Sequence, residues 1–221
     1  MQKVLDHYAA SDWRADRALI TGDLIQDDSA EAYDRFREQL LPLNMRMHCI
    51  PGNHDIRNLM QPVCSRPPFS YCAREEVRDW LLLGLDSCIT GDAGGEIAAE
   101  EFERLDSIVS ASAAKHVLVF LHHPPVPTGS AWLDTVILKN GEELLKALQA
   151  MNRVRLLVFG HAHQVYEEEH YGIQVIGTPS TCRQFERGSE DFAVDDHPPA
   201  YRRISLHADG STENELIWVD D

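Results

Sequence analysis

The chain has 221 residues, of which 43% are hydrophobic and 25% are charged, as is ordinary for a globular protein. Its 36 acidic residues outnumber its 20 basic ones and give a formal net charge of −16, a surface that repels DNA and RNA, so we expect no nucleic-acid partner. The sequence has no run of about 18 apolar residues, which excludes an ordinary helical membrane span. A small anionic substrate agrees with this charge if metal cations dominate the local field.

The chain opens with a helical pattern around Val4 and Tyr8, and its first residues do not resemble a signal peptide. An apolar run over residues 17–21 then predicts a strand. Residues 28–31 can cap a second helix, which is expected to stop at Pro42.

Further strands and helices alternate downstream. Four more apolar runs predict strands buried on both faces, at residues 45–50, 80–85, 116–121 and 154–159. Apolar residues at helical spacing predict helices from Glu96 to Ser110 and from Glu142 to Met151. This alternation favours an α/β layered fold. The runs at residues 173–177, 201–206 and 215–219 are strand-like, and we expect them on the far side of a second sheet.

The cysteines and the absence of a linker bear on organisation and location. Five cysteines lie at positions 49, 64, 72, 88 and 182 without a C-x-x-C pair. Such an unpatterned set indicates reduced thiols, so the predicted location is the cytoplasm. No linker-like composition interrupts the sequence, which predicts a single domain over residues 1–221.

Four polar clusters directly follow four of the predicted strands. They are Gly22-Asp23, Gly52-Asn53-His54-Asp55, His122-His123-Pro124-Pro125 and Gly160-His161-Ala162-His163. Each cluster alone is a weak signal, because Gly, Asp and Asn are common in turns. Together they indicate one site, since α/β sheets hold their ligands at the carboxyl ends of strands. A carboxylate, an amide oxygen and imidazoles suit Mn, Fe or Zn better than Mg or Ca.

In this order the motifs G-D-x-x-x-D, G-N-H-D, H-H-P-P and G-H-x-H resemble the calcineurin-like metallophosphoesterase superfamily. Within it, the chain is similar to the bacterial class III cyclic-AMP phosphodiesterases, on Leu85-Asp86-Ser87, residues 181–185 and the tail from Asp191 to Arg202. The resemblance covers nearly the whole chain. It implies a four-layer α/β/β/α sandwich of two mixed sheets. It also implies hydrolysis of 3′,5′-cyclic AMP to 5′-AMP by a hydroxide activated between two divalent metal ions, with Mn or Fe preferred and Zn as a further option.

The resemblance also implies a set of metal ligands. Asp23 would bridge the two ions, Asn53, His122 and His161 would complete the shell of one ion, and His163 would bind the other. The substrate would be a small cyclic nucleotide. Formation of a homodimer stays an open alternative.

Other residues receive roles outside the metal shells. His54 would donate a proton to the leaving oxygen, and together with Asn53 and His163 it would contact the substrate. The neighbouring His123 is expected to support the structure rather than bind metal. Asp27 would orient its loop or begin a helix.

One departure from the superfamily pattern concerns the second metal. The superfamily opens with a strand that ends in D-x-H, whose Asp and His share a metal with His163, and no D-x-H precedes Asp23. The sequence Asp195-Asp196-His197 belongs to the tail resemblance and is not expected to substitute. We therefore expect a fold without its first strand, an incomplete second metal shell, and a natural start upstream of Met1.

Two alternatives to cyclic-AMP hydrolysis stay open. One is a metallophosphoesterase acting on another phosphodiester or nucleotide, although the acidic surface disfavours DNA ends. The other is a catalytically impaired regulator that binds a nucleotide and one metal ion. The number of metal ions per chain would separate the regulator from the enzyme.

Overall fold

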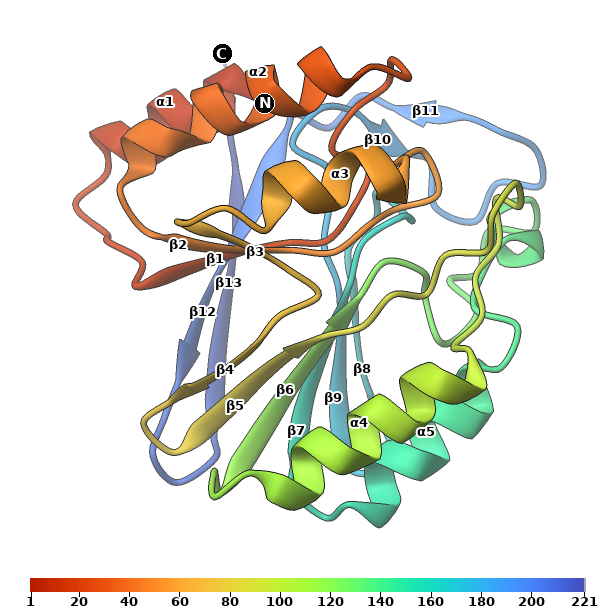
Figure 1. Cartoon of the computed structure of the whole chain (residues 1–221). Coiled ribbons are helices and arrows are strands. Elements are labelled where there is room, and N and C mark those ends of the chain that lie inside the picture. The colour runs from red at the N-terminus through yellow and green to blue at the C-terminus, as the bar shows by residue number, and fades with distance from the viewer. Residues whose placement is uncertain (221) are drawn as a thin grey trace.

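Residues 1–220 of the computed structural model form two stacked sheets between two layers of helices (Figure 1). The bounds of the five helices are α1 (Gln2–Ala10), α2 (Ala30–Leu40), α3 (Arg57–Cys64), α4 (Ala99–Ala111) and α5 (Gly141–Ala150). The first three helices lie over a small sheet and the last two over a large one, and short 3-10 turns occur at Leu41–Leu43 and Leu133–Thr135. This arrangement confirms the predicted α/β sandwich.

The small sheet has three parallel strands in the order β1 (Arg17–Ile20), β2 (Arg46–Cys49) and β3 (Phe69–Tyr71). β2 is buried from its second residue onward, whereas all four residues of the edge strand β1 are half-buried. Among the described residues β1 has a strand partner on one side only. This free edge agrees with the expectation that the D-x-H strand is missing.

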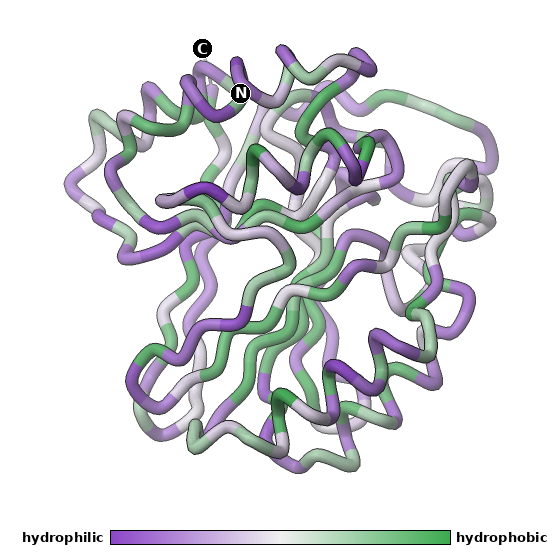
Figure 2. The backbone as a smooth tube through the Cα atoms, in the orientation of Figure 1, coloured by the Kyte–Doolittle hydropathy of each residue, from purple (hydrophilic) through white to green (hydrophobic). Residues whose placement is uncertain are grey.

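The large sheet is mixed and has six strands in the order β4-β5-β6-β7-β9-β8. Their bounds are β4 (Arg74–Val77), β5 (Trp80–Gly84), β6 (His116–Leu121), β7 (Val154–Phe159), β8 (Tyr166–His170) and β9 (Ile173–Gly177). The central strands β5, β6 and β7 are parallel and almost wholly buried, and Figure 2 shows a hydrophobic centre there. The charged outer strands β4 and β8 were not predicted, because solvated edge strands lack an apolar run.

The expectation that the three C-terminal runs share one sheet is wrong. β9 joins the large sheet between β7 and β8. Within residues 1–220, β12 (Ala200–Leu206) and β13 (Thr212–Trp218) pair only with each other, as an antiparallel ribbon. A further short pair, β10 (Gln184–Phe185) with β11 (Val194–Asp195), precedes this ribbon.

Three apolar clusters hold the layers together. One joins α4 and α5 to the large sheet, the second joins α2 and α3 to the small sheet, and the third fills the space between the sheets. α2 begins as expected, because Ser29 Oγ accepts a hydrogen bond of 3.2 Å from the backbone N–H of Ala32. No helix within the described part of the chain is long and apolar enough to cross a bilayer.

Candidate metal centre

Four loops present polar side chains at the carboxyl ends of β1, β2, β6 and β7, as predicted. Asp23, His161 and His163 have positive φ angles of 54°, 59° and 49°. Left-handed backbone is uncommon for residues with a side chain, and it concentrates at functional sites. The chain therefore turns sharply after β1 and β7, where three of the predicted ligands lie.

Two glycines let these loops approach each other. Gly22 has a φ of +94°, and a Cβ atom at this position would overlap the ring of His122. A Cβ atom at Gly52 would overlap the carboxylate of Asp23. Only glycine fits such close backbone approaches, so both residues shape the site.

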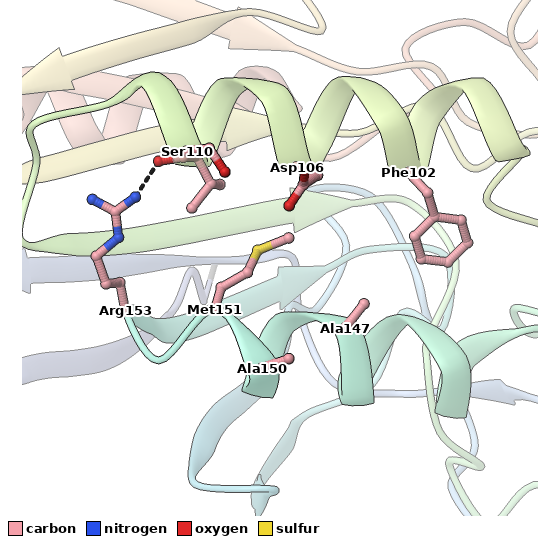
Figure 3. Close-up of a pocket in the computed structure, with 8 residues that line it drawn as sticks. Phe102, Asp106, Ser110, Ala147, Ala150, Met151 and Arg153 are labelled. Atoms are coloured by element: carbon pink, nitrogen blue, oxygen red, sulfur yellow. Dashed lines mark hydrogen bonds between the residues drawn. The ribbon is translucent and has the colours of Figure 1, made fainter.

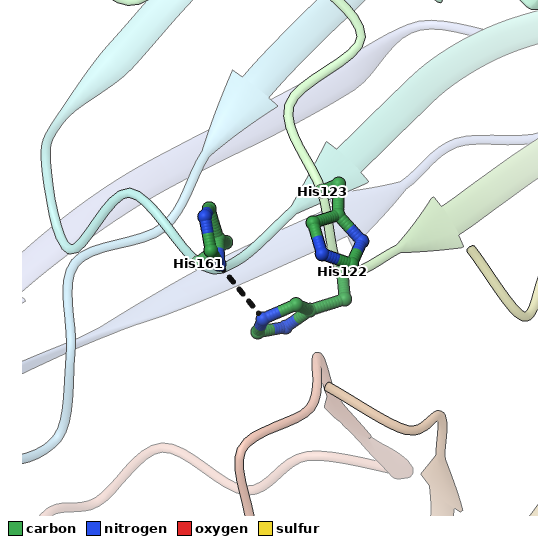
Figure 4. Close-up of side chains that lie close together, drawn as sticks. All are labelled: His122, His123 and His161. Atoms are coloured by element: carbon green, nitrogen blue, oxygen red, sulfur yellow. Dashed lines mark hydrogen bonds between the residues drawn. The ribbon is translucent and has the colours of Figure 1, made fainter. Parts of the chain in front are cut away.

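Three side-chain atoms converge on one point between the sheets. His122 Nε2 lies 3.1 Å from Asn53 Oδ1 and 3.1 Å from His161 Nδ1, and the last two atoms are 3.0 Å apart. In Figure 4 a dashed line joins the His161 and His122 rings, whose planes are 76° apart. The carboxylate of Asp23 adds a fourth atom, because Asp23 Oδ2 lies 3.4 Å from His122 Nε2.

The chemistry of this cluster suits a metal ion. The carbonyl of Thr21 can only accept a hydrogen bond, so His122 Nδ1, at 2.7 Å, donates to it. His122 Nε2 then carries a lone pair in the neutral ring, and it faces the amide oxygen of Asn53, which is also an acceptor. Two acceptors at 3.1 Å need a proton or a cation between them. An oxygen and two imidazole nitrogens are ligands that borderline divalent metals accept.

The charges of the site reinforce one another. Burial alone would raise the pKa of Asp23, but the neighbouring His122 and the backbone N–H of His54, at 3.0 Å, hold it below its ordinary value. Burial alone would lower the pKa of His122, but Asp23 raises it above its ordinary value. Burial and the nearby His122 lower the pKa of His161. Asp23 is thus an anion, and His161 is a neutral base with a free lone pair.

His123 lies close to His122 and His161 but is engaged elsewhere. Ring nitrogens of the three histidines fall within 4.8 Å of one another. His123 Nδ1 is hydrogen-bonded to Ser87 Oγ at 2.8 Å, and His123 Nε2 to the carbonyl of Ala93 at 3.2 Å. Burial, helped by His122, lowers the pKa of His123 to about 3. These contacts agree with the structural role predicted for His123.

His163 lies at the border of the cluster. Its ring stacks on Phe185, with centroids 4.3 Å apart and planes 9° apart, and its Nδ1 atom is buried without a hydrogen-bond partner in the structure. Burial lowers its pKa, while the charge of Asp23 acts in the opposite direction. A buried nitrogen without a partner near a carboxylate fits a second metal ligand.

The remaining predicted residues lie further from the cluster. Asp27 is exposed and forms an ion pair of 2.7 Å with Arg35, so it belongs to the start of α2. The Asp195 Oδ1 and His197 Nδ1 atoms pair with each other at 2.5 Å, and the His197 ring packs against Trp218. The D-x-H sequence of the tail is thus engaged within its own segment, as expected for a sequence that does not substitute.

Asp55 organises the site but received no role from its motif. Its carboxylate accepts hydrogen bonds from the backbone N–H groups of Leu24 and Gly52, at 3.2 and 2.9 Å, and from the hydroxyl of Tyr33 at 3.0 Å. It therefore joins the loops after β1 and β2 to α2. The position directly after Asn53-His54 was the only signal in the sequence.

One cavity lies away from the histidine cluster. It has a volume of about 510 Å³ and is lined by residues of α4, α5 and the turn after α5, among them Phe102, Asp106, Met151 and Arg153 (Figure 3). Arg153 directly precedes β7, so the cavity is at the amino end of the strands. The clustered histidines are at the opposite end.

The fold and the histidine-rich cluster define a metal-dependent phosphoesterase. Residues 1–165 match the family model of the calcineurin-like phosphoesterases, and the chain belongs to this family. This result confirms the predicted superfamily.

Curated relatives confirm the predicted subgroup resemblance. The chain is 38% identical to the 3′,5′-cyclic adenosine monophosphate phosphodiesterase CpdA of Haemophilus influenzae, over 91% of this chain and 74% of that protein. It is 34% identical to CpdA of Escherichia coli K12, over 100% of this chain and 80% of that protein. A 3′,5′-cyclic-nucleotide phosphodiesterase of Nostoc is 33% identical, over 92% of this chain and 77% of that protein.

Solved structures support the fold. A dimetal phosphatase from Danio rerio matches with a TM-score of 0.65 and 16% identity, over 93% of this chain and 84% of that one. PhoD matches with a TM-score of 0.56 and 9% identity, over 99% of this chain and 67% of that one. At such identities the match establishes the architecture alone.

Proposed function

We propose that this chain hydrolyses 3′,5′-cyclic AMP to 5′-AMP with divalent metal ions. The observation that carries this proposal is the convergence of Asn53 Oδ1, His122 Nε2 and His161 Nδ1 beside the carboxylate of Asp23. The curated cyclic-nucleotide phosphodiesterases at 33–38% identity supply the substrate class. The free cysteines of the described residues support a cytoplasmic enzyme, which we propose works as one domain.

The proposed ligands divide between two metal ions. Asp23, Asn53, His122 and His161 would hold one ion, and His163 with Asp23 would hold part of the shell of the other. Mn and Fe suit this mixture of oxygen and nitrogen ligands, and Zn is a further option. When bound, the ions supply Lewis acidity at the phosphoryl oxygens and lower the pKa of a water nucleophile.

His54 is the proposed general acid. Its backbone N–H is fixed to Asp23 Oδ1 at 3.0 Å, while the residue is exposed and its ring makes no hydrogen bond among the described residues. The ring is thus free to reach a substrate beside the cluster. As the water releases one proton to solvent and its oxygen bonds to phosphorus, the bond to the 3′ oxygen breaks and protonated His54 gives its proton to that oxygen. The 5′ ester stays intact, which yields 5′-AMP.

Release of 5′-AMP from cyclic AMP in the presence of Mn²⁺ tests this proposal. His54→Ala should lower kcat by about 10²–10⁴-fold, the range for loss of a general acid. His197→Ala is the matched control, because His197 is an exposed histidine that packs on Trp218, and it should keep the wild-type rate. A folded, metal-loaded chain that releases no 5′-AMP would contradict the proposal.

The border position of His163 favours one alternative, a regulator that binds a nucleotide and a single metal ion. In the described part of the chain, no hydrogen bond and no ring contact joins the His163 ring to the His122 and His161 rings. Metal analysis of the purified chain separates the two functions: about two ions per chain support the enzyme, and about one supports the regulator.

A further inference from the structure

Three aromatic rings lead from His163 to the surface. Phe185 stacks on the His163 ring at 4.3 Å. Trp132 and Phe192 meet Phe185 edge to face, with centroids at 5.3 and 5.4 Å, and they meet each other at 5.3 Å. We call Trp132, Phe185 and Phe192 the aromatic wall. It borders the candidate metal centre through Phe185.

Phe192 is the outer end of this wall. Its exposed fraction is 63%, the highest among the large apolar side chains of residues 1–220. Single exposed apolar side chains are common and need no explanation. Phe192 differs from such residues because its ring continues an aromatic cluster that reaches a predicted metal ligand.

The chain fixes the wall in place. Trp132 Nε1 donates to Ser189 Oγ at 3.1 Å. Ser130 Oγ accepts hydrogen bonds from the backbone N–H of Gly188 and from Gln164 Nε2, both at 2.9 Å. The loop between β10 and β11 is thereby tied to the segment around Trp132. A wall held in this way binds a flat ligand with little ordering cost.

We propose that the aromatic wall stacks on the nucleobase of the cyclic nucleotide, with Phe192 as its exposed contact. This inference rests on the proposed function and names the part of the site that selects the substrate. Aromatic side chains stack on the π-face of a base. Exposed acidic residues beside the wall, which are Glu186, Glu190 and Asp191, outnumber the exposed Arg183 and Arg187. They disfavour a second phosphate but accept an uncharged base.

The first test compares two substrates with the same reacting phosphodiester, cyclic AMP and an abasic ribose 3′,5′-cyclic phosphate. Phe192→Ala should lower the ratio of their kcat/KM values by about tenfold to a hundredfold, mainly through the KM for cyclic AMP. Phe192→Trp should restore the ratio. Leu41→Ala is the control, because Leu41 is 41% exposed and lies after α2. An unchanged ratio in Phe192→Ala overturns the proposal.

A binding test separates this inference from the proposed function, because it needs neither metal nor turnover. Adenosine should quench the fluorescence of Trp132, and Trp132→Phe identifies that part of the signal. Phe192→Ala should weaken the binding of adenosine about tenfold or more. If no cyclic nucleotide is hydrolysed but this weakening is observed, the proposed function is wrong, while the proposal that the aromatic wall binds the nucleobase is supported. If adenosine does not quench Trp132, the proposal that the aromatic wall binds the nucleobase is wrong, even if the enzyme is active.

Discussion

The two sheets contribute to the metal centre in different ways. His122 and His161 follow β6 and β7, central strands of the large sheet whose last residues, Leu121 and Phe159, are fully buried. Asp23 follows β1, an edge strand of the small sheet with half-buried residues. Strands with neighbours on both sides and apolar layers on both faces have little freedom to move. The histidine half of the site is thus held by the core, and the carboxylate half needs other support.

Polar cross-links supply that support. Asp55 joins the loops after β1 and β2, and Glu75 on β4 of the large sheet binds Arg17 on β1. Glu75 bridges two sheets that no strand pairing connects, and Asp55 ties together the loops that follow the paired strands β1 and β2. The difference teaches that a site between two sheets can rest on packing at one side and on hydrogen bonds at the other.

Matched leucine substitutions should show this contrast most strongly. Leu157→Ala on β7 empties a fully buried position and should cost about 2–5 kcal/mol of unfolding free energy. Leu19→Ala on β1 removes a half-buried side chain and should cost about 1 kcal/mol. Urea unfolding measures both values. Equal losses would show that β1 is held by its apolar contacts as firmly as β7.

Gly52→Ala should disturb the carboxylate half of the site directly. The added methyl group would overlap the Asp23 carboxylate, and a displacement of about 1 Å at a catalytic site costs on the order of 10²-fold in rate. Hydrolysis of cyclic AMP measures this loss. Gly172→Ala is the control, because Gly172 also has a special backbone, with φ +74°, but no atom lies within 4 Å of the added position. If Gly52→Ala keeps full activity, hydrolysis does not depend on the observed position of the Asp23 carboxylate.

The sequence predicted the buried half of the molecule better than its edges. Strands such as β6 and β7 are apolar runs in the sequence because both of their faces are covered. The histidines that follow these strands could therefore be predicted as site residues. The strands β4 and β8 escaped prediction because they carry charged residues at sheet edges, and α3 because Pro62 lies within it. The roles of Asp55 and Glu75 could not be predicted, since most of their partners lie more than 20 residues away in the sequence.

Glu75→Gln should weaken the other cross-link, with the smallest effect of the three. The carboxylate of Glu75 accepts hydrogen bonds from Arg17 Nε at 2.9 Å and Arg46 Nη1 at 2.5 Å, and pairs with His48 Nε2 at 2.7 Å. Loss of its charge should cost about 1.5–3 kcal/mol at pH 7, the range for hydrogen bonds to charged groups. Urea unfolding at pH 7 measures this loss, and Glu169→Gln on the exposed face of β8 should have no effect.

The pH dependence of stability identifies the Glu75 cross-link. Burial alone would raise the pKa of Glu75, but Arg17 and His48 hold it below the ordinary 4.5, so its contribution is present above pH 4.5 and is lost as the pH falls through the folded pKa. Burial lowers the pKa of His48 below 6.5 in the folded protein. As the pH falls, His48 is therefore protonated in the unfolded chain before it is protonated in the folded chain, and the stability declines below pH 6.5. Glu75→Gln should remove the decline that Glu75 causes below pH 4.5. It should deepen the decline that starts at 6.5, because Glu75 raises the pKa of His48 and its loss lowers that pKa further. Identical slopes below pH 4.5 in the wild type and in Glu75→Gln would show that Glu75 does not hold β1 to the large sheet through its charge.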